Sequence, residues 1–91
     1  AVGDSALSTS AYGYDNSALG SKSLKSNTTG HGNMASGAYA MSSNTSGSFN
    51  VANGAYAMSS NIYGYHNTAT GYYCLSENIS GANNTAYGSN A

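Results

Sequence analysis

The fold is decided by residues 35–68, which read ASGAYAMSSNTSGSFNV (35–51) and then ANGAYAMSSNIYGYHNT (52–68). The two segments have equal length and agree at most of their 17 positions. Working outward without a gap, the same pattern divides the chain into 1–17, 18–34, 35–51, 52–68, 69–85 and a partial sixth repeat, 86–91. Self-similarity at a fixed period is the signature of a repeat architecture, in which each repeat forms one structural unit.

Several positions of the 17-residue repeat are constant, and we number them 1 to 17 within each repeat. Position 1 is always Ala, positions 3 and 13 are always Gly, and position 6 is always small. Of the twelve glycines, only Gly32 falls outside positions 3 and 13. Position 7 is always Leu or Met, in Leu7, Leu24, Met41, Met58 and Leu75. Position 16 is always Asn, in Asn16, Asn33, Asn50, Asn67 and Asn84.

Each constant position has a physical interpretation if every repeat forms one coil. Equivalent residues then stack about 4.8 Å apart, which is the spacing between neighbouring strands. The Leu or Met column predicts a buried apolar ladder, and the Ala and small columns predict a narrow interior. The Asn column predicts a ladder of amides that bond from coil to coil. The glycine columns mark turns with positive φ or close approaches of two backbones.

We therefore predict an all-β fold, a parallel β-solenoid or β-roll with one 17-residue coil per repeat, in a single segment over residues 1–91. Seventeen residues suffice for two strands of about five residues joined by two turns. Coils 4.8 Å apart would make a rod about 25 Å long. No apolar stripe of helical period is present, and Gly and Asn are too frequent for a helical repeat.

Composition excludes several classes of function. The net charge is -1, only 5% of residues are charged, and Lys22 and Lys25 are the only basic residues. We therefore expect no nucleic-acid partner. No apolar run is long enough to span a membrane, so we expect no membrane insertion by this segment. A chain without Pro and rich in Asn, Ser, Thr and Tyr favours stacked β-structure over a solvated coil.

Four stretches resemble a known family. They are A-x-G at Ala18–Gly20, S-N-T-T-G at Ser26–Gly30, S-N-T-S-G at Ser43–Gly47 and N-T-A-T-G at Asn67–Gly71. Together they resemble the head repeats of trimeric autotransporter adhesins (YadA-like heads) and similar repeat tracts of phage and giant-virus tail-fibre-like proteins. The resemblance implies a left-handed parallel β-roll, a homotrimer and an adhesive or spacer function. The adhesin repeat is usually shorter, and the tail-fibre-like tracts fit the 17-residue spacing better.

No pattern in the sequence predicts catalysis or a cofactor. His31 and His66 occupy different repeat positions, the three acidic residues are scattered, and no ligand pair recurs, so we expect no metal site. No set of nucleophile, base and orienting group stands out, so we expect no enzyme. Cys74 occupies the small column and is expected to be a buried structural thiol. Four N-x-S/T triplets, at Asn27, Asn44, Asn78 and Asn83, are what this composition yields by chance.

Tyrosine is the one residue type that predicts a ligand surface. Tyr39, Tyr56 and Tyr73 share position 5 in three successive repeats. A ladder of phenols can present flat amphipathic faces to a glycan or a protein. The same ladder can instead pack coil on coil or form a subunit interface, and this second interpretation is the stronger one.

These observations favour a non-enzymatic rod of an extracellular fibre or surface adhesin, on a bacterial outer membrane or a virion. Such a rod spaces or presents a receptor-binding surface, and its expected partners are copies of itself, as a trimer or fibre, and a host-surface glycan or protein. One alternative is the solenoid part of a phage tail fibre or spike. Another is an ice-binding β-solenoid, which would need a flat T-x-T array in every coil. Position 11, which reads Ala11, Thr28, Thr45, Ile62 and Ile79, does not supply it.

Overall fold

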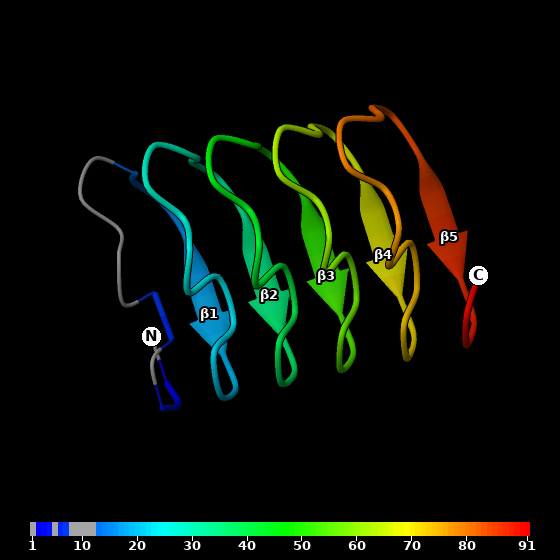
Figure 1. The fold of residues 1–91 in the computed structure, drawn as a ribbon, viewed down its shortest axis with the longest axis horizontal. Coiled ribbons are helices and arrows are strands. Elements are labelled where there is room, and N and C mark those ends of the chain that lie inside the picture. The colour runs from blue at the N-terminus through cyan, green and yellow to red at the C-terminus, as the bar shows by residue number, and fades with distance from the viewer. Residues whose placement is uncertain (1, 5, 8–12) are drawn as a thin grey trace.

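A computed structural model describes residues 2–4, 6–7 and 13–91. Five strands form one parallel sheet in sequence order (Figure 1). The strands are β1 (Ser17–Leu19), β2 (Met34–Ser36), β3 (Val51–Asn53), β4 (Thr68–Thr70) and β5 (Thr85–Tyr87). Every pairing joins residues 17 apart, as in Ala18 with Ala35 and Ala35 with Ala52. The prediction of an all-β solenoid with 17-residue spacing is confirmed.

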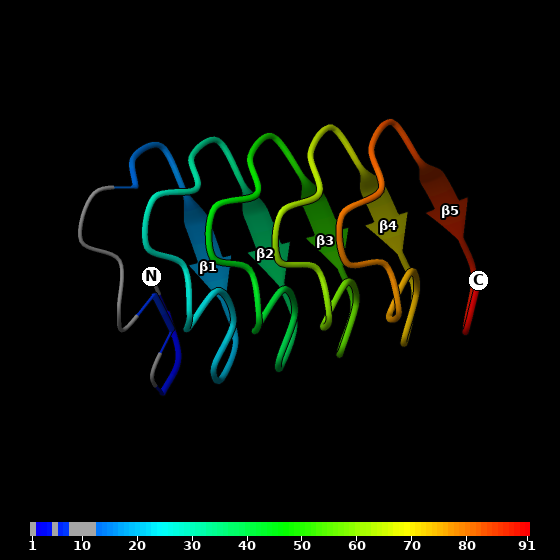
Figure 2. The ribbon, with the colours of Figure 1, turned by 45° about the horizontal axis from the view of Figure 1, so that its top comes forward.

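In the described residues each repeat contributes one strand of three residues, so the two five-residue strands for which a 17-residue coil has room do not form (Figure 2). The rest of the coil is made of turns, because the backbone repeatedly enters the left-handed region. Around Met41, for example, φ is 127° at Gly37, 62° at Tyr39 and 51° at Met41. A strand needs consecutive extended residues, and positive φ at positions 3, 5, 7 and 15 interrupts them. Positions 8–14 have no positive φ but form turns and bends, as in residues 42–48.

The residues at position 15 share one backbone conformation although they are of five different types. All five have a positive φ near 60°: Asp15, Gly32, Phe49, His66 and Asn83. Gly32, which stands outside the glycine columns, therefore occupies a position where its backbone freedom is used. A side chain at position 32 would also meet the ring of Phe49, because an added Cβ would lie 2.8 Å from Phe49 Cδ1.

The two glycine columns are required for different reasons. Position 3 has φ between 108° and 136° in all six repeats, a region that side chains avoid. Position 13 has no such φ in the glycines described, but it lies against the carbonyl of the next coil. A Cβ at Gly64 would lie 2.7 Å from the oxygen of Gly81 and 3.0 Å from Nδ2 of Asn67. Position 13 is therefore glycine because two backbones approach too closely for a side chain.

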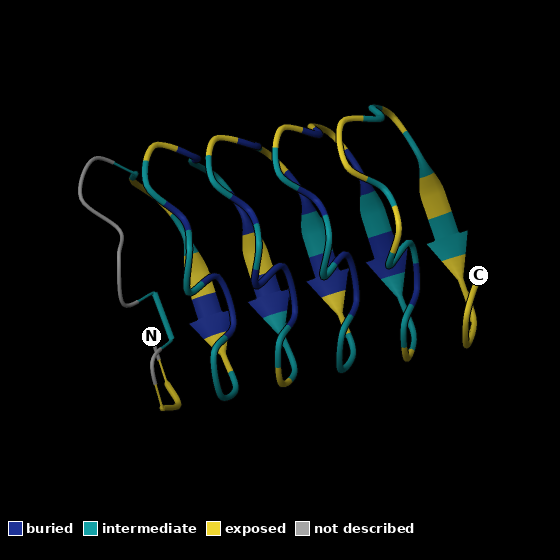
Figure 3. Ribbon diagram, viewed as in Figure 1, coloured by how far each residue is buried: buried dark blue, intermediate teal, exposed yellow. Residues whose placement is uncertain are grey.

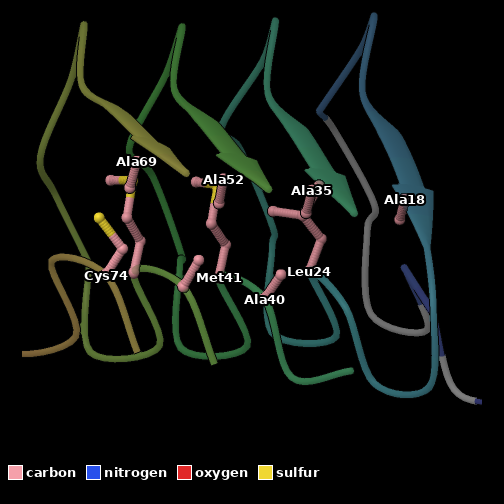
Figure 4. Close-up of a cluster of buried hydrophobic side chains, with 10 residues drawn as sticks. Ala18, Leu24, Ala35, Ala40, Met41, Ala52, Ala69 and Cys74 are labelled. Carbon is pink, nitrogen blue, oxygen red and sulfur yellow. The ribbon is translucent and has the colours of Figure 1, made fainter. Parts of the chain in front are cut away.

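The interior is one narrow column of small and medium side chains. Leu24, Met41 and Met58 are completely buried, while Leu7 and Leu75, toward the two ends, are partly buried against the same cluster. Figure 4 shows this column running inside the coils, with Ala35, Ala52 and Ala69 beside it and Cys74 at its far end. In Figure 3, each of the strands β1 to β4 carries a buried segment, whereas β5 does not. Ala1, the first member of the Ala column, lies outside the described residues. The chain measures 30 × 23 × 17 Å.

Backbone hydrogen bonds tie each turn to its neighbours. Three consecutive amides, those of Thr45, Ser46 and Gly47, donate to the single carbonyl oxygen of Ile62 at 3.1–3.2 Å. The same convergence occurs one coil earlier on Thr45 and one coil later on Ile79. The conformation at position 11 is thus held by hydrogen bonds to its backbone carbonyl. Its side chain takes no part in these backbone bonds and can vary from Thr to Ile.

Candidate functional site

The asparagines of position 16 form a buried ladder along the interior. Asn50 donates its backbone N–H to Oδ1 of Asn33 at 3.0 Å, and its Nδ2 donates to the same oxygen at 3.2 Å. Nδ2 of Asn50 also donates to the carbonyl of Gly64 at 2.7 Å. Asn67 repeats these bonds one coil further on. The amides of this column are therefore used to join coils.

Position 10 supplies a second ladder, which the sequence analysis missed. Nδ2 of Asn44 donates to Oδ1 of Asn27 at 2.9 Å and to the carbonyl of Gly47 at 3.1 Å. Asn61 and Asn78 continue the series with bonds of 2.9 Å. The signal was present as Asn at position 10 in four successive repeats. It was obscured because the first repeat has Ser10, which lies outside the described residues.

Both ladders converge on the carbonyl of the position 13 glycine. Gly47, for example, accepts Nδ2 of Asn44 from its own coil and Nδ2 of Asn33 from the preceding coil. Among the described residues, no buried side-chain nitrogen or oxygen lacks a hydrogen-bond partner. The buried polar groups are thus satisfied internally and leave no inward-facing donor for a ligand. Of the four N-x-S/T triplets, those at Asn27 and Asn44 have their asparagine side chains fully buried inside the rod.

The tyrosines of position 5 form a parallel stack on the surface, which we call the tyrosine stack. The ring centroids of Tyr39 and Tyr56 lie 5.0 Å apart and those of Tyr56 and Tyr73 lie 4.7 Å apart, with 2° between planes in each pair. Lys22 occupies position 5 of the preceding coil. Its Nζ donates to the hydroxyl of Tyr39 at 3.1 Å and lies 5.3 Å from the ring centroid. This hydrogen bond raises the pKa of the Lys22 ammonium group.

Tyr72 stands beside the tyrosine stack. Its ring is perpendicular to those of Tyr73 and Tyr56, at centroid distances of 4.6 and 6.4 Å. Together with the 4.7 Å between Tyr56 and Tyr73, these distances place Tyr72 beside the Tyr56–Tyr73 pair and closer to Tyr73. Partial burial raises the pKa of the Tyr73 phenol, and the neighbouring phenols of Tyr72 and Tyr56 add to the shift. Tyr72 itself remains 52% exposed.

This arrangement determines which parts of the tyrosines a ligand can reach. Both faces of Tyr56 are covered, by Tyr39 on one side and Tyr73 on the other. The stack therefore offers ring edges and hydroxyl groups to solvent, while the exposed part of Tyr72 supplies aromatic surface. A flat sugar ring cannot insert between rings that are already in contact, whereas the ring of Tyr72 is 52% exposed.

A second aromatic feature runs along positions 14 and 15, and we call it the mixed aromatic row. His31 stacks on Tyr14 at a centroid distance of 4.6 Å with 7° between planes, and the ring of Phe49 is perpendicular to that of His31 at 5.2 Å. His66 continues the row at 5.3 Å from Phe49 and contacts Tyr65 at 5.7 Å. Sequence analysis separated the two histidines because they occupy different repeat positions. The row exists because positions 14 and 15 both project toward the same strip of surface.

The outer face of the sheet carries positions 17 and 2, and it changes character along the rod. Val2, Leu19 and Met34, near the N-terminal end, are more than half exposed. Thr68 and Thr70 on β4 and Thr85 on β5 give the C-terminal half a hydroxyl-bearing surface. A T-x-T pair occurs here only on β4 among the described strands, so the face lacks the regular array that ice binding requires.

The potential metal-ligating side chains of the described residues do not gather into one group, and the hollow described below is shallow. No group of three His, Cys, Asp or Glu side chains that could hold a metal ion occurs among residues 2–4, 6–7 and 13–91. Cys74 is fully buried, and its thiol donates to the carbonyl of Ala86 at 3.2 Å. A shallow hollow lies at the C-terminal end, lined by Leu75, Ser76, Glu77, Asn78, Asn90 and Ala91. A search of the described residues for a helix capable of crossing a bilayer finds none.

The geometry thus defines a tandem-repeat β-solenoid. Its buried polar side chains are hydrogen-bonded within the protein, and its aromatic clusters lie on the surface. No protein-family model, no curated protein and no solved structure matches this chain.

Proposed function

We propose that this chain is a rod section of an extracellular fibre or surface adhesin, which works by structure and surface contact instead of catalysis. The observation that carries the proposal is the pair of asparagine ladders, whose buried amides join one described coil to the next. A protein built this way gains rigidity along its axis and keeps its variable residues outside.

We further propose that the rod is a parallel homotrimer. The narrow interior contains few large apolar side chains, and a core of this size rarely stabilises an isolated chain. The apolar residues outside the interior belong to four columns: Val2 and Leu19 at position 2, Phe49 at position 15, Ile62 and Ile79 at position 11, and Met34 and Val51 at position 17. The N-terminal half of the sheet face is the best candidate for the shared surface, because Val2 and Leu19 lie there beside Met34.

Light scattering on the purified chain tests the assembly. We expect a mass three times the 9.1 kDa of one chain, and a shift toward single chains in Leu19→Asp. The matched control is Asn53→Asp, which places the same charge at position 2 of β3, outside the apolar patch. A folded 9.1 kDa monomer at micromolar concentration would refute the trimer and show that the narrow interior suffices.

Binding to immobilised glycans and host-surface proteins tests the adhesive role. Because Tyr72 carries exposed aromatic surface beside the tyrosine stack, Tyr72→Ala should weaken binding. Tyr63→Ala removes an equally large ring that is 60% exposed and has no ring partner among the described residues, so it should bind as the parent does. Equal loss in both variants would argue against a site at the stack, and binding by neither parent nor variants would leave only the spacer role.

Ice binding is the weaker alternative. It rests on the three threonines Thr68, Thr70 and Thr85 on the outer sheet face. Thermal hysteresis of a concentrated solution would favour it.

A further inference from the structure

The tyrosine stack and Tyr72 bring four phenols into one cluster. Neighbouring centroids lie 4.6–5.0 Å apart along the series Tyr39, Tyr56, Tyr73 and Tyr72. Because the planes of Tyr56 and Tyr73 differ by only 2°, each carbon ortho to the hydroxyl of one ring lies about one ring spacing from the other ring. These phenols come from coils held in fixed register by the sheet and by the asparagine ladders.

Phenols held in this way are suited to oxidative coupling. A one-electron oxidant removes an electron and a proton from a phenol and leaves a phenoxyl radical with spin on the oxygen and the ortho carbons. Two neighbouring radicals form one carbon–carbon bond between ortho carbons, and the hydrogens displaced from those carbons restore the two hydroxyl groups. Each link removes two electrons and two protons, which reduce one molecule of hydrogen peroxide to two of water at a haem peroxidase.

We propose that the tyrosine stack is an oxidative modification site, at which a peroxide-dependent one-electron oxidant joins Tyr56 to Tyr73 through a dityrosine bond. Tyr72 is the point of entry, because it is 52% exposed and its ring contacts that of Tyr73 at a centroid distance of 4.6 Å. The bond links positions 17 residues apart and closes one coil covalently. A cross-link of this kind restricts the unfolded chain and so stabilises the folded rod.

The other described tyrosines lack this geometry. Tyr63 and Tyr87 are 60% and 70% exposed but have no ring contact with another tyrosine among the described residues. Tyr14 and Tyr65 contact histidine rings instead. If exposure decided which tyrosines couple, Tyr63 and Tyr87 would react first. If the distance between rings decides it, the tyrosine stack reacts instead, so the two possibilities predict different products. The coupling depends only on the fold and is independent of the adhesive role proposed above.

The chain carries its own cleavage sites for the test. Cyanogen bromide cuts after Met34, Met41 and Met58, which releases 35–41 containing only Tyr39, 42–58 containing only Tyr56, and 59–91 containing Tyr73. Met41 and Met58 are completely buried, whereas Met34 is 53% exposed and open to oxidation by peroxide. Any methionine sulfoxide is therefore reduced back to methionine before cleavage. The folded chain is treated at low concentration with a haem peroxidase and hydrogen peroxide, then cleaved and analysed by mass spectrometry and dityrosine fluorescence.

We expect fragment 42–58 to be joined to 59–91 with the loss of two hydrogen atoms, within a single chain on a denaturing gel. Tyr73→Phe should abolish this product, while Tyr63→Phe and Tyr87→Phe should leave it unchanged. Tyr73→Phe keeps the ring in the stack, and a link between 35–41 and 42–58 in that variant would show that the stack is still folded. Persistence of the 42–58 to 59–91 product in Tyr73→Phe, or its loss in Tyr63→Phe, would overturn the proposal, as would products confined to Tyr63 and Tyr87.

Discussion

At the scale of single residues, the glycines of position 13 are the least replaceable. A methyl group at Gly47 would lie closer than contact distance to the carbonyl of Gly64 and to Oδ1 of Asn44. Both atoms belong to hydrogen bonds between coils, so neither can move away without breaking them. We expect Gly47→Ala to lower the free energy of unfolding by about 3 kcal/mol. Denaturant titration measures this, and Ser46→Ala at the exposed neighbouring position should change it little.

The second asparagine ladder makes a prediction about charge. Asn44 is fully buried and donates Nδ2 to two acceptor oxygens, those of Asn27 and Gly47. An aspartate there would bring a third acceptor to the same place, so Asn44→Asp should cost about 3–5 kcal/mol at neutral pH. Burial raises the pKa of such a carboxyl group, and a protonated one can donate again, so stability should return partly as the pH falls. Asn53→Asp, which is exposed, should show neither effect.

Tyr73 makes the stability depend on alkaline pH. Its surroundings raise the pKa of the phenol above its ordinary value of 10.0 in the folded chain. The stabilisation is therefore complete below the ordinary pKa and is lost as the pH rises through the higher folded value. We expect the free energy of unfolding to fall with rising pH above about 10, and to fall less steeply in Tyr73→Phe. Identical pH profiles for parent and variant would contradict this assignment.

At the scale of the element, the coil is stabilised more by its interior column than by its sheet. The strands are only three residues long and contribute one buried residue each in β1 to β4. Met58 is completely buried between coils, so Met58→Asp would place an unpaired charge among apolar neighbours. We expect this variant to unfold or dissociate at room temperature, as followed by circular dichroism. Tyr63→Asp, on the surface, should melt like the parent.

At the scale of the whole molecule, the exact period of 17 residues holds the coils in register. Deleting 52–68 removes one complete repeat and joins two equivalent positions, so the remaining columns still stack. We expect this variant to fold with a lower melting temperature, because each repeat is stabilised mainly by its neighbours. Deleting 52–67 instead shifts every later residue by one position in the repeat. Glycines after the deletion would then stack on residues that carry side chains in the coil before it. Equal melting temperatures for the two deletions would show that register is not decisive.

The whole rod is also expected to fold without a metal ion. Its buried polar groups bond to one another, and no cluster of three potential ligands occurs in the described ranges. A chelator should therefore leave the melting temperature unchanged, as measured by calorimetry before and after dialysis. A fall in melting temperature that added metal reverses would refute this expectation.

The sequence by itself determined the repeat length and therefore the class of fold. Because the period of 17 has no gaps, equivalent residues of successive repeats can stack directly on one another. The sheet register, which pairs residues 17 apart, follows from this stacking. The Leu and Met column could be assigned to the interior because it is the only column that is always large and apolar. The column of Asn16, Asn33, Asn50, Asn67 and Asn84 pointed to amide ladders because a buried polar side chain must find a partner.

Only the tertiary structure decided how the chain travels within one coil. Tyr39, Phe49 and Met41 adopt positive φ, which their residue types do not reveal, because bonds between coils hold them in that conformation. Those turns shorten the strands, bring positions 14 and 15 into one aromatic row, and turn the phenols of Tyr39, Tyr56 and Tyr73 parallel. Periodicity fixes which residues are equivalent, whereas the direction in which each one points depends on backbone angles set by contacts 17 residues away.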